Sequence, residues 1–262
     1  MNSMRLFGRQ RKMADHDPVE ISEKGGIRFM HLGGHAVQSA MRMRDPWALE
    51  LEYTRAMLAF LLFAPEARDI ALIGLGGGSI AKFIHRRLPE CCLTALEINP
   101  DVVAAARGYF FLPPDDERLQ VRVADGAEYV GQQMASLDVL LVDGYDAKRI
   151  VEALASPPFY RSCREALRPG GVAIFNLWGS DQYFDTYMQR IDAAFDQRTL
   201  ILPAEQKGNI QVFAFKPPLP NVGFSFLSAQ AKDWETRLGL EFTRFLARMR
   251  SVNACTEKAF QV

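Results

Sequence analysis

The sequence predicts an α/β protein with a doubly wound, mostly parallel sheet, which ends in an antiparallel hairpin and follows a small N-terminal β-hairpin domain. Three observations predict this class. Apolar strand-like segments alternate with amphipathic segments from Asp69 to about residue 177, as in consecutive βαβ units. A glycine-rich turn follows the first strand at residues 74–78. Acids follow three successive strands, at Glu97, Asp125 and Asp143.

The segment before this alternation has a different pattern. Residues 1–16 are basic and contain no long apolar run, which predicts a disordered tail. Glycine pairs interrupt residues 17–44 and predict β-hairpins. The Asp-Pro pair at 45–46 predicts the start of a helix. This helix completes a small domain, residues 17–64, and links it to a nucleoside-binding domain, residues 65–262.

The larger domain contains five predicted parallel strands, at residues 70–73, 93–97, 119–124, 138–142 and 171–177. Their continuous apolar runs are typical of strands that helices cover on both faces. Residues 198–202 and 210–215 predict the antiparallel hairpin, across a Gly-Asn turn. One amphipathic helix is predicted over residues 229–250.

The bulk properties predict a cytoplasmic protein. The chain has 262 residues and a formal net charge of zero, so no overall field favours nucleic acid or an anionic membrane. No apolar run reaches the length of a membrane span. The four cysteines show neither metal-ligand spacing nor a disulfide framework, as expected in a reducing compartment. The four histidines form no metal set, so no metal is expected.

The glycine turn and the acids behind it predict a nucleoside site. The glycines are Gly74, Gly76, Gly77 and Gly78. They let backbone N–H groups approach a ligand at a helix N-terminus. Glu97 follows at close to the roughly 20 residues typical of an acid that binds ribose hydroxyls. Asp125, which Gly126 follows, can accept from the adenine amine. Each acid alone is better explained as a solvated residue or a helix cap, but the series behind a glycine turn favours the site.

Asp143 lies at the end of the strand next to the glycine turn, so it faces the reacting end of a bound nucleoside. With Asp146 it places two carboxylates on one short loop, and such a pair can bind an amine and accept its proton. An alkyl amine has a reference pKa near 10.4 and cannot attack while protonated. A general base typically contributes about 10²–10⁴-fold. The alternative, an Asx turn or helix N-cap, suits Asp146 better than Asp143.

Several segments match the successive motifs of one family. They are residues 74–79, Leu96-Glu97-Ile98-Asn99, Ala124-Asp125-Gly126-Ala127-Glu128, Asp143-Gly144-Tyr145-Asp146, Pro158-Phe159-Tyr160 and Leu167-Arg168-Pro169-Gly170-Gly171. Over about residues 30–180 the chain thereby resembles the spermidine synthase family of polyamine aminopropyltransferases. The resemblance implies a methyltransferase-like sheet behind a small β domain, and a homodimer. It also implies aminopropyl transfer from decarboxylated S-adenosylmethionine to putrescine or a related amine.

The resemblance implies roles for single residues. Asp143 would be the catalytic base, with Tyr145 and Asp146 beside it in the amine site. Tyr53 matches a tyrosine that helps to position the attacking amine. Gln38 matches a glutamine that contacts the nucleoside, although its spacing to Tyr53 is longer here than in the family.

The amine half of the site departs from the family pattern. Gly77 stands where the family usually has an aspartate that binds the aminopropyl amine, so intact S-adenosylmethionine stays an alternative cofactor. Thr54 and Arg55 replace His or Gln followed by Glu, and residues 147–150 replace a Pro-Val-Gly-Pro stretch. A cationic diamine needs paired negative charge. The changes therefore count against putrescine and are compatible with an acceptor whose anionic group faces Arg55 or Arg149.

Two other functions stay open. An S-adenosylmethionine-dependent methyltransferase would share the fold and the adenosine contacts, although the Asn-Pro-Pro-Tyr motif of many amino-methyltransferases is absent after the fourth strand. A non-catalytic nucleoside-binding protein would use Glu97 and Asp125, while Asp143 and Tyr53 had no chemical role. A nicotinamide dehydrogenase is disfavoured, because Ser79 replaces the third glycine of the dinucleotide fingerprint.

Overall fold

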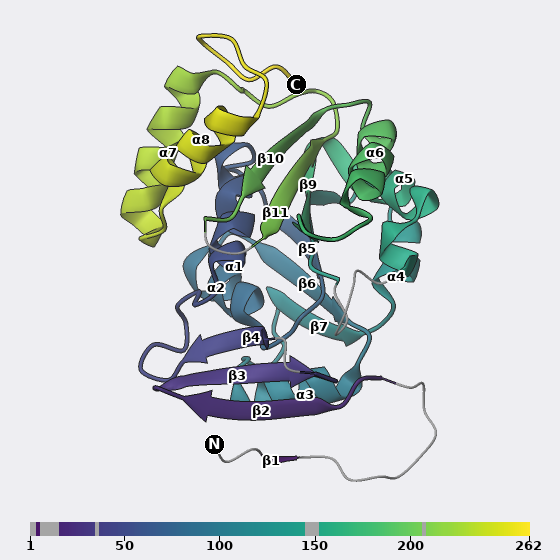
Figure 1. Ribbon diagram of the computed structural model, residues 1–262, viewed down its shortest axis with the longest axis vertical. Helices are drawn as coiled ribbons and strands as arrows, with labels where there is room; N and C mark the ends of the chain where they lie inside the picture. The colour runs from purple at the N-terminus through teal and green to yellow at the C-terminus, as the bar shows by residue number, and fades with distance from the viewer. Residues whose placement is uncertain (1–3, 6–15, 35–36, 145–151, 206–207) are drawn as a thin grey trace.

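Two β-sheets organise the fold (Figure 1). The computed structural model describes residues 4–5, 16–34, 37–144, 152–205 and 208–262. The small antiparallel sheet contains, in spatial order, β1 (Met4–Arg5), β2 (Val19–Lys24), β3 (Ile27–Leu32) and β4 (Val37–Arg42). The large sheet contains, in spatial order, β10 (Thr199–Pro203), β11 (Asn209–Phe215), β9 (Leu167–Trp178), β8 (Leu137–Val142), β5 (Asp69–Ile73), β6 (Cys92–Glu97) and β7 (Leu119–Val123).

The strand order of the large sheet places a crevice beside β5. The chain moves outward from β5 through β6 to β7 and then returns to β8, on the other side of β5. Strands β9, β8, β5, β6 and β7 pair in parallel, whereas β11 is antiparallel to both of its neighbours. The predicted fold class is therefore confirmed. In such sheets ligands bind at the carboxyl ends of the strands where the order reverses, here between β5 and β8.

Helices cover both faces of the large sheet. One face is covered by α1 (Glu52–Met57), the 3₁₀-helix η1 (Leu58–Leu62), α2 (Ser79–Arg87), α7 (Phe224–Leu238) and α8 (Phe242–Val252). The other is covered by α4 (Gly126–Gly131), the 3₁₀-helix η2 (Glu152–Ala155), α5 (Pro157–Ala166) and α6 (Phe184–Ala194). Along β5, Ile70 and Leu72 pack into the first core and Ala71 and Ile73 into the second, as the two-residue period of a strand requires.

The small sheet closes over the carboxyl ends of the large one. Helix α3 (Pro100–Tyr109) packs against the small sheet in a third apolar cluster. Lys82 of α2 is buried and donates from Nζ to the carbonyl oxygens of Phe110, at 2.6 Å, and Pro46, at 2.9 Å. Burial lowers the pKa of Lys82 to about 8. These contacts tie α2, the helix that follows the glycine turn, to the segments after α3 and β4, and Lys82 Nζ also lies 3.3 Å from Sδ of Met41 in β4.

Two predicted helices differ from the structure. The single helix expected over residues 229–250 is wrong, because Gly239, with φ +70°, ends α7 in the left-handed conformation before α8 begins. The helix expected to start at the Asp-Pro pair begins only at Glu52. Asp45 instead forms a turn, in which its Oδ1 accepts from the backbone N–H of Trp47 at 3.3 Å.

The predicted N-terminal tail is described only in part. Of the predicted tail, Met4–Arg5 forms β1 and pairs with β2, and most of the remainder lies outside the described residues. None of the helices in the described ranges is long and apolar enough to cross a membrane.

Candidate active site

The turn after β5 brings two strand ends close together. Gly74, with φ +91°, lies against the end of β8, where a Cβ would come within 2.1 Å of the carbonyl oxygen of Asp143. No residue with a side chain fits this approach, so Gly74 allows the glycine turn and Asp143 to be neighbours. Gly78 then precedes α2 as its N-cap residue, with φ +73°.

Glu97, at the end of β6, holds the glycine turn in place. Its Oε2 accepts from the backbone N–H of Leu75 at 3.0 Å, and its Oε1 accepts from the backbone N–H of Asn99 at 3.0 Å. Burial raises the pKa of Glu97, while hydrogen bonds from neighbouring backbone N–H groups oppose that rise. The carboxylate therefore shapes the turn.

Asp125 caps the helix that follows β7. Its Oδ1 accepts from the backbone N–H of Ala127 at 2.7 Å and, more weakly, from that of Glu128 at 3.4 Å. The helix-cap interpretation is thus confirmed for one oxygen of this carboxylate. Gly126 follows in close contact with β5, because a Cβ there would come within 2.5 Å of Ile73 Cγ2.

A small cavity of about 110 Å³ gathers most of the predicted nucleoside residues. The predicted residues that line it are Gln38, Gly74, Gly76, Glu97, Asp125, Gly126 and Asp143. Gly77 and Gly78 are not among its lining residues. The volume is below the roughly 300–1,000 Å³ of typical small-molecule pockets. A nucleoside bound here therefore extends past Asp143 or widens the pocket.

Asp143 is partly buried and directly follows β8. Its Oδ1 accepts from Nδ2 of Asn176 at 2.8 Å, and its carboxylate also accepts from the hydroxyl of Tyr53. Burial raises the pKa of Asp143, the two hydrogen bonds lower it, and the charge of Glu97 raises it. Burial and the Asp143 carboxylate raise the pKa of Tyr53 well above its usual value, so Tyr53 stays a neutral donor. The tyrosine and the aspartate predicted to act together are in contact.

A larger cavity of about 690 Å³ lies on the other side of Asp143. It is bounded by residues of β3, β4, α1, β9, β11 and α8. Gln38 and Asp143 line both cavities, so the carboxylate stands at their junction. The Tyr53 hydroxyl lies 3.5 Å from the carbonyl oxygen of Gln38, which brings the predicted catalytic pair next to the small sheet.

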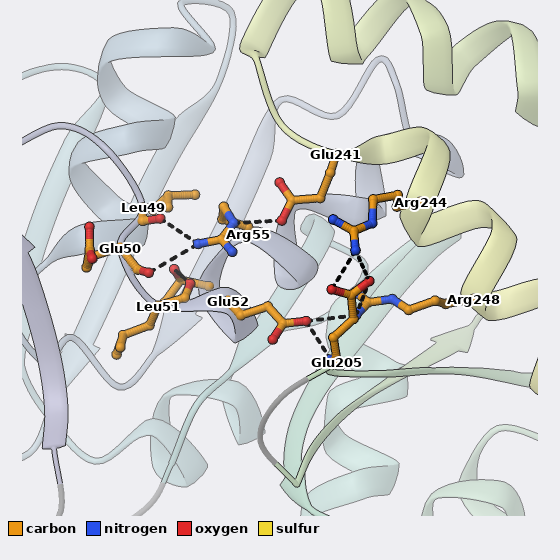
Figure 2. Close-up of polar contacts among 10 residues, drawn as sticks. Leu49, Glu50, Leu51, Glu52, Arg55, Glu205, Glu241, Arg244 and Arg248 are labelled. Atoms are coloured by element: carbon orange, nitrogen blue, oxygen red, sulfur yellow. Dashed lines mark hydrogen bonds and ion pairs between the residues drawn. The ribbon is translucent and has the colours of Figure 1, made fainter.

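Charged side chains line the larger cavity (Figure 2). Besides Asp143, they are Glu50, Glu52, Arg55, Glu205, Glu241, Arg244 and Arg248. Carboxylates therefore outnumber guanidinium groups among the described lining residues. The larger cavity offers a site of net negative charge to a ligand.

Arg55 is neutralised by its surroundings. Its Nε donates to Glu241 at 2.8 Å, and its Nη1 donates to the carbonyl oxygens of Leu49 and Glu50 at 3.0 and 3.1 Å. The preceding Thr54 is buried and donates to the carbonyl oxygen of Leu51 at 2.6 Å. Arg55 therefore favours an anionic acceptor less than expected from the sequence, because Glu241 already pairs with this arginine. Arg149 lies outside the described residues.

A second group of ion pairs joins α1, α8 and the segment after β10. Arg248 pairs with Glu52 at 2.7 Å, and Arg244 pairs with Glu205 at 2.6 Å (Figure 2). The backbone N–H of Glu205 also donates to Glu52 at 2.6 Å. These partners come from distant parts of the chain, and for that reason sequence patterns gave no signal for them.

A group of amides behind Asp143 was not predicted from the sequence. Asn176 of β9 is buried and accepts at Oδ1 from Gln211 Nε2, at 2.9 Å, and from Asn209 Nδ2, at 3.1 Å. The signal in the sequence was Asn176 itself, a polar residue inside the apolar strand β9.

The predicted substrate residues Tyr145 and Asp146 lie outside the described residues. Within the described part of the chain, no group of three or more histidine, cysteine, aspartate or glutamate side chains could hold a metal.

Comparisons with known proteins agree with this geometry. The "Spermine/spermidine synthase domain" family matches residues 50–204. The polyamine aminopropyltransferase of Chromobacterium violaceum is 42% identical over 91% of this chain and 91% of that protein.

Two solved structures share the fold. A spermidine synthase in complex with the transition state analogue AdoDATO has a TM-score of 0.70 and 21% identity, and the match covers 91% of this chain and 84% of that one. Human methyltransferase-like protein 13 in complex with SAH has a TM-score of 0.65 and 26% identity, with 72% of this chain and 93% of that one covered.

The family match covers more than half of this chain, and the bacterial relative is similar over nearly the whole length of both proteins. The resemblance that the sequence motifs indicated is confirmed. The chain belongs to the spermine/spermidine synthase family, and it is an enzyme of the aminopropyltransferase type.

Proposed function

We propose that this enzyme transfers the aminopropyl group of decarboxylated S-adenosylmethionine to a primary amine, with Asp143 as the general base. The observation that carries the proposal is the place of Asp143, a partly buried carboxylate at the junction of two cavities. The small cavity holds the predicted nucleoside residues, and the large one has the charge that an amine requires. A base at the junction reaches a proton on an amine that attacks a bound nucleoside.

The reaction proposed is a direct displacement. The amine lone pair attacks the aminopropyl carbon next to the sulfonium, the carbon–sulfur bond breaks, and methylthioadenosine leaves as a neutral thioether. The nitrogen becomes positively charged as the new bond forms, and a proton passes from it to Asp143. Tyr53, held against Asp143, orients the carboxylate and the incoming nitrogen. Tyr145 and Asp146 are proposed to complete the amine site.

The nucleoside half is proposed to bind by three groups. Glu97 would accept from the ribose hydroxyls, since its oxygens also hold Leu75 and Asn99 and are fixed in direction. Asp125 would accept from the adenine amine with the oxygen that does not cap α4. Gln38, with Gly74 and Gly76, would close the pocket over the sugar. Gly77, Gly78 and Gly126 would shape the turn and the floor.

The acceptor is proposed to be a cationic amine with more than one charged nitrogen. The carboxylates of the larger cavity outnumber its guanidinium groups, and Arg55 is paired with Glu241. Charge-assisted hydrogen bonds to carboxylates are about twice as strong as neutral ones, so a second ammonium group gains from this lining. An acceptor with an anionic group is therefore less well supported by the structure than by the sequence alone.

Calorimetry on the purified enzyme tests the proposal first. It measures the affinity for four nucleosides: S-adenosylmethionine, its decarboxylated form, methylthioadenosine and S-adenosylhomocysteine. Tighter binding of decarboxylated S-adenosylmethionine and methylthioadenosine is expected, and mass spectrometry should then find an acceptor that is heavier by one aminopropyl group. Tighter binding of S-adenosylmethionine and S-adenosylhomocysteine, with methylated product, would overturn it. Absence of binding by all four would favour a protein without this chemistry.

Methyl transfer is the second candidate, because the human methyltransferase-like protein shares the fold at 26% identity. The same calorimetry distinguishes the two reactions by the carboxylate of the cofactor.

We also propose that the enzyme is a homodimer in the cytoplasm. Light scattering of the purified enzyme should give about twice the 29.5 kDa mass of one chain, and a monomer at assay concentration would contradict the dimer.

A further inference from the structure

Three amides on β9 and β11 form a directed set of hydrogen bonds that ends on Asp143. Asn176 Nδ2 donates to Asp143 Oδ1 at 2.8 Å, and Asn176 Oδ1 accepts from Gln211 Nε2 and Asn209 Nδ2 at 2.9 and 3.1 Å. An asparagine amide has one accepting oxygen and one donating nitrogen. With two donors on its oxygen, Asn176 must turn its nitrogen towards the carboxylate. The reverse orientation would place its oxygen against the oxygens of Asp143.

Gln211 is a costly residue for its position. It is fully buried in the middle of β11, where its neighbours Ile210 and Val212 are apolar. Its Oε1 has no hydrogen-bond partner among the described residues, so the buried amide is only half satisfied. A buried polar atom without a partner costs about 1–3 kcal/mol. An apolar side chain of the same length would avoid this cost, and packing therefore does not explain the glutamine.

We propose that Gln211, assisted by Asn209, is a positioning residue that fixes Asn176 as a hydrogen-bond donor to Asp143 and so keeps the catalytic carboxylate ionised and correctly aimed. The inference rests on the proposed function, because it takes Asp143 as the base. Gln211 does not line either cavity, whereas Asn176 and Asn209 line the larger one. It acts only through Asn176.

The electrostatic setting explains why a fixed donor matters. The titratable groups that face Asp143 among the described residues are Tyr53 from α1 and Glu97 from β6. Burial and Glu97 raise the pKa of Asp143, and among the described residues the hydrogen bonds from Asn176 and Tyr53 lower it. If Gln211 no longer holds the Asn176 oxygen, Asn209 is the one remaining donor of the pair, and the amide is held less firmly in this orientation. The pKa of Asp143 then rises, and the fraction of ionised base falls at a given pH.

The substitution Gln211→Met tests the proposal because it removes the donor and keeps an unbranched side chain of similar length. We expect unchanged nucleoside affinity by calorimetry, equal or higher thermal stability, and an acid limb of the kcat profile that moves to higher pH. A shift of about one pH unit corresponds to a tenfold change in the ionisation constant. Activity should recover as the pH is raised, which a merely structural loss would not allow.

The control is Val212→Thr, a substitution at the next residue of β11, whose side chain packs in the opposite core. It perturbs the strand but does not contact the amides, so its acid limb should stay with that of the unmodified enzyme. If Gln211→Met and Val212→Thr give the same pH profile, the proposal is overturned.

A second measurement does not depend on turnover. Carboxyl ¹³C NMR of aspartate-labelled protein reports the ionisation of Asp143, whose signal is identified by its loss in Asp143→Asn. A higher midpoint in Gln211→Met than in the unmodified protein supports the positioning role, and equal midpoints overturn it. If no amine is aminopropylated but the midpoint shifts, the proposed function fails while the role of Gln211 stands.

Discussion

The two cavities that meet at Asp143 are built in different ways. The small cavity is formed by backbone turns at strand ends, and its acids Glu97 and Asp125 are fixed by backbone N–H groups. The large cavity is formed by charged side chains from distant segments, and these side chains pair with one another. A backbone-built pocket has little freedom to change its ligand. A pocket of paired side chains changes its charge with single substitutions, so within one fold we expect the acceptor to vary more easily than the nucleoside.

Asp143→Asn gives the largest expected effect, because it removes the base at the junction and leaves both cavities in place. We expect kcat to fall by about 10²–10⁴-fold, the usual contribution of a general base. Binding of methylthioadenosine should stay within about threefold, since the substituted side chain keeps its shape. Steady-state kinetics and calorimetry on the same preparation measure both quantities. Full activity in this variant would show that Asp143 is not the base.

The pH dependence of the unmodified enzyme is the next largest effect. Burial raises the pKa of Asp143, so the carboxylate loses its charge at a higher pH than an exposed aspartate does. The base works only when ionised. The rate should therefore fall tenfold for each pH unit below this raised pKa. A kcat profile that stays flat down to the usual range of an aspartate, near pH 4, would contradict the assignment.

Glu97→Gln tests the backbone-built cavity. One of the two carboxylate oxygens becomes an amide nitrogen, which must face a backbone N–H donor at Leu75 or Asn99. Leaving that donor unsatisfied costs about 1–3 kcal/mol. We expect weaker nucleoside binding, by about 10–100-fold, and a lower melting temperature.

Asp125→Asn is the matched control for this change, because asparagine is an equally good N-cap and keeps α4 intact. It should weaken nucleoside binding without lowering the melting temperature. Unchanged nucleoside affinity in both variants would remove these two acids from the site.

The same contrast separates what the sequence could predict from what it could not. The small cavity follows from local patterns, because Gly74 to Gly78, Glu97 and Asp125 each lie at or just after the end of a strand. The role of Asn176 and Gln211 could not be read locally, because two strands must pair before their amides meet. Gly239 was missed in the predicted last helix because the apolar spacing continues through it, although a glycine in that position ends the helix.

Gly77→Asp tests the departure from the family at the glycine turn. A Cβ at Gly77 would come within 2.7 Å of Ser39 Oγ and 2.8 Å of Phe110 Cδ1, so the space is already filled. Overpacking of this kind costs about 1–3 kcal/mol. We expect a lower free energy of unfolding and no gain in affinity for decarboxylated S-adenosylmethionine.

Gly77→Ala is the steric control and should lose a similar amount of stability. If Gly77→Asp instead binds the decarboxylated cofactor more tightly at unchanged stability, the turn has room for the aspartate that the family usually carries there. The glycine would then reflect a different cofactor and not the local packing.

Opposite substitutions in one ion pair give the smallest effect and test the side-chain-built cavity. Arg244 is largely exposed and pairs with Glu205, and both residues line the larger cavity. Arg244→Gln makes the lining more negative and should lower KM for a cationic acceptor, whereas Glu205→Gln should raise it, each by a fewfold. Stability should change by less than about 1 kcal/mol in both, as for other surface ion pairs. Because the two changes break the same pair but alter the charge in opposite directions, equal shifts in KM would mean that the pair acts through structure. Opposite shifts that shrink as salt is added would mean that the charge of this cavity attracts the acceptor.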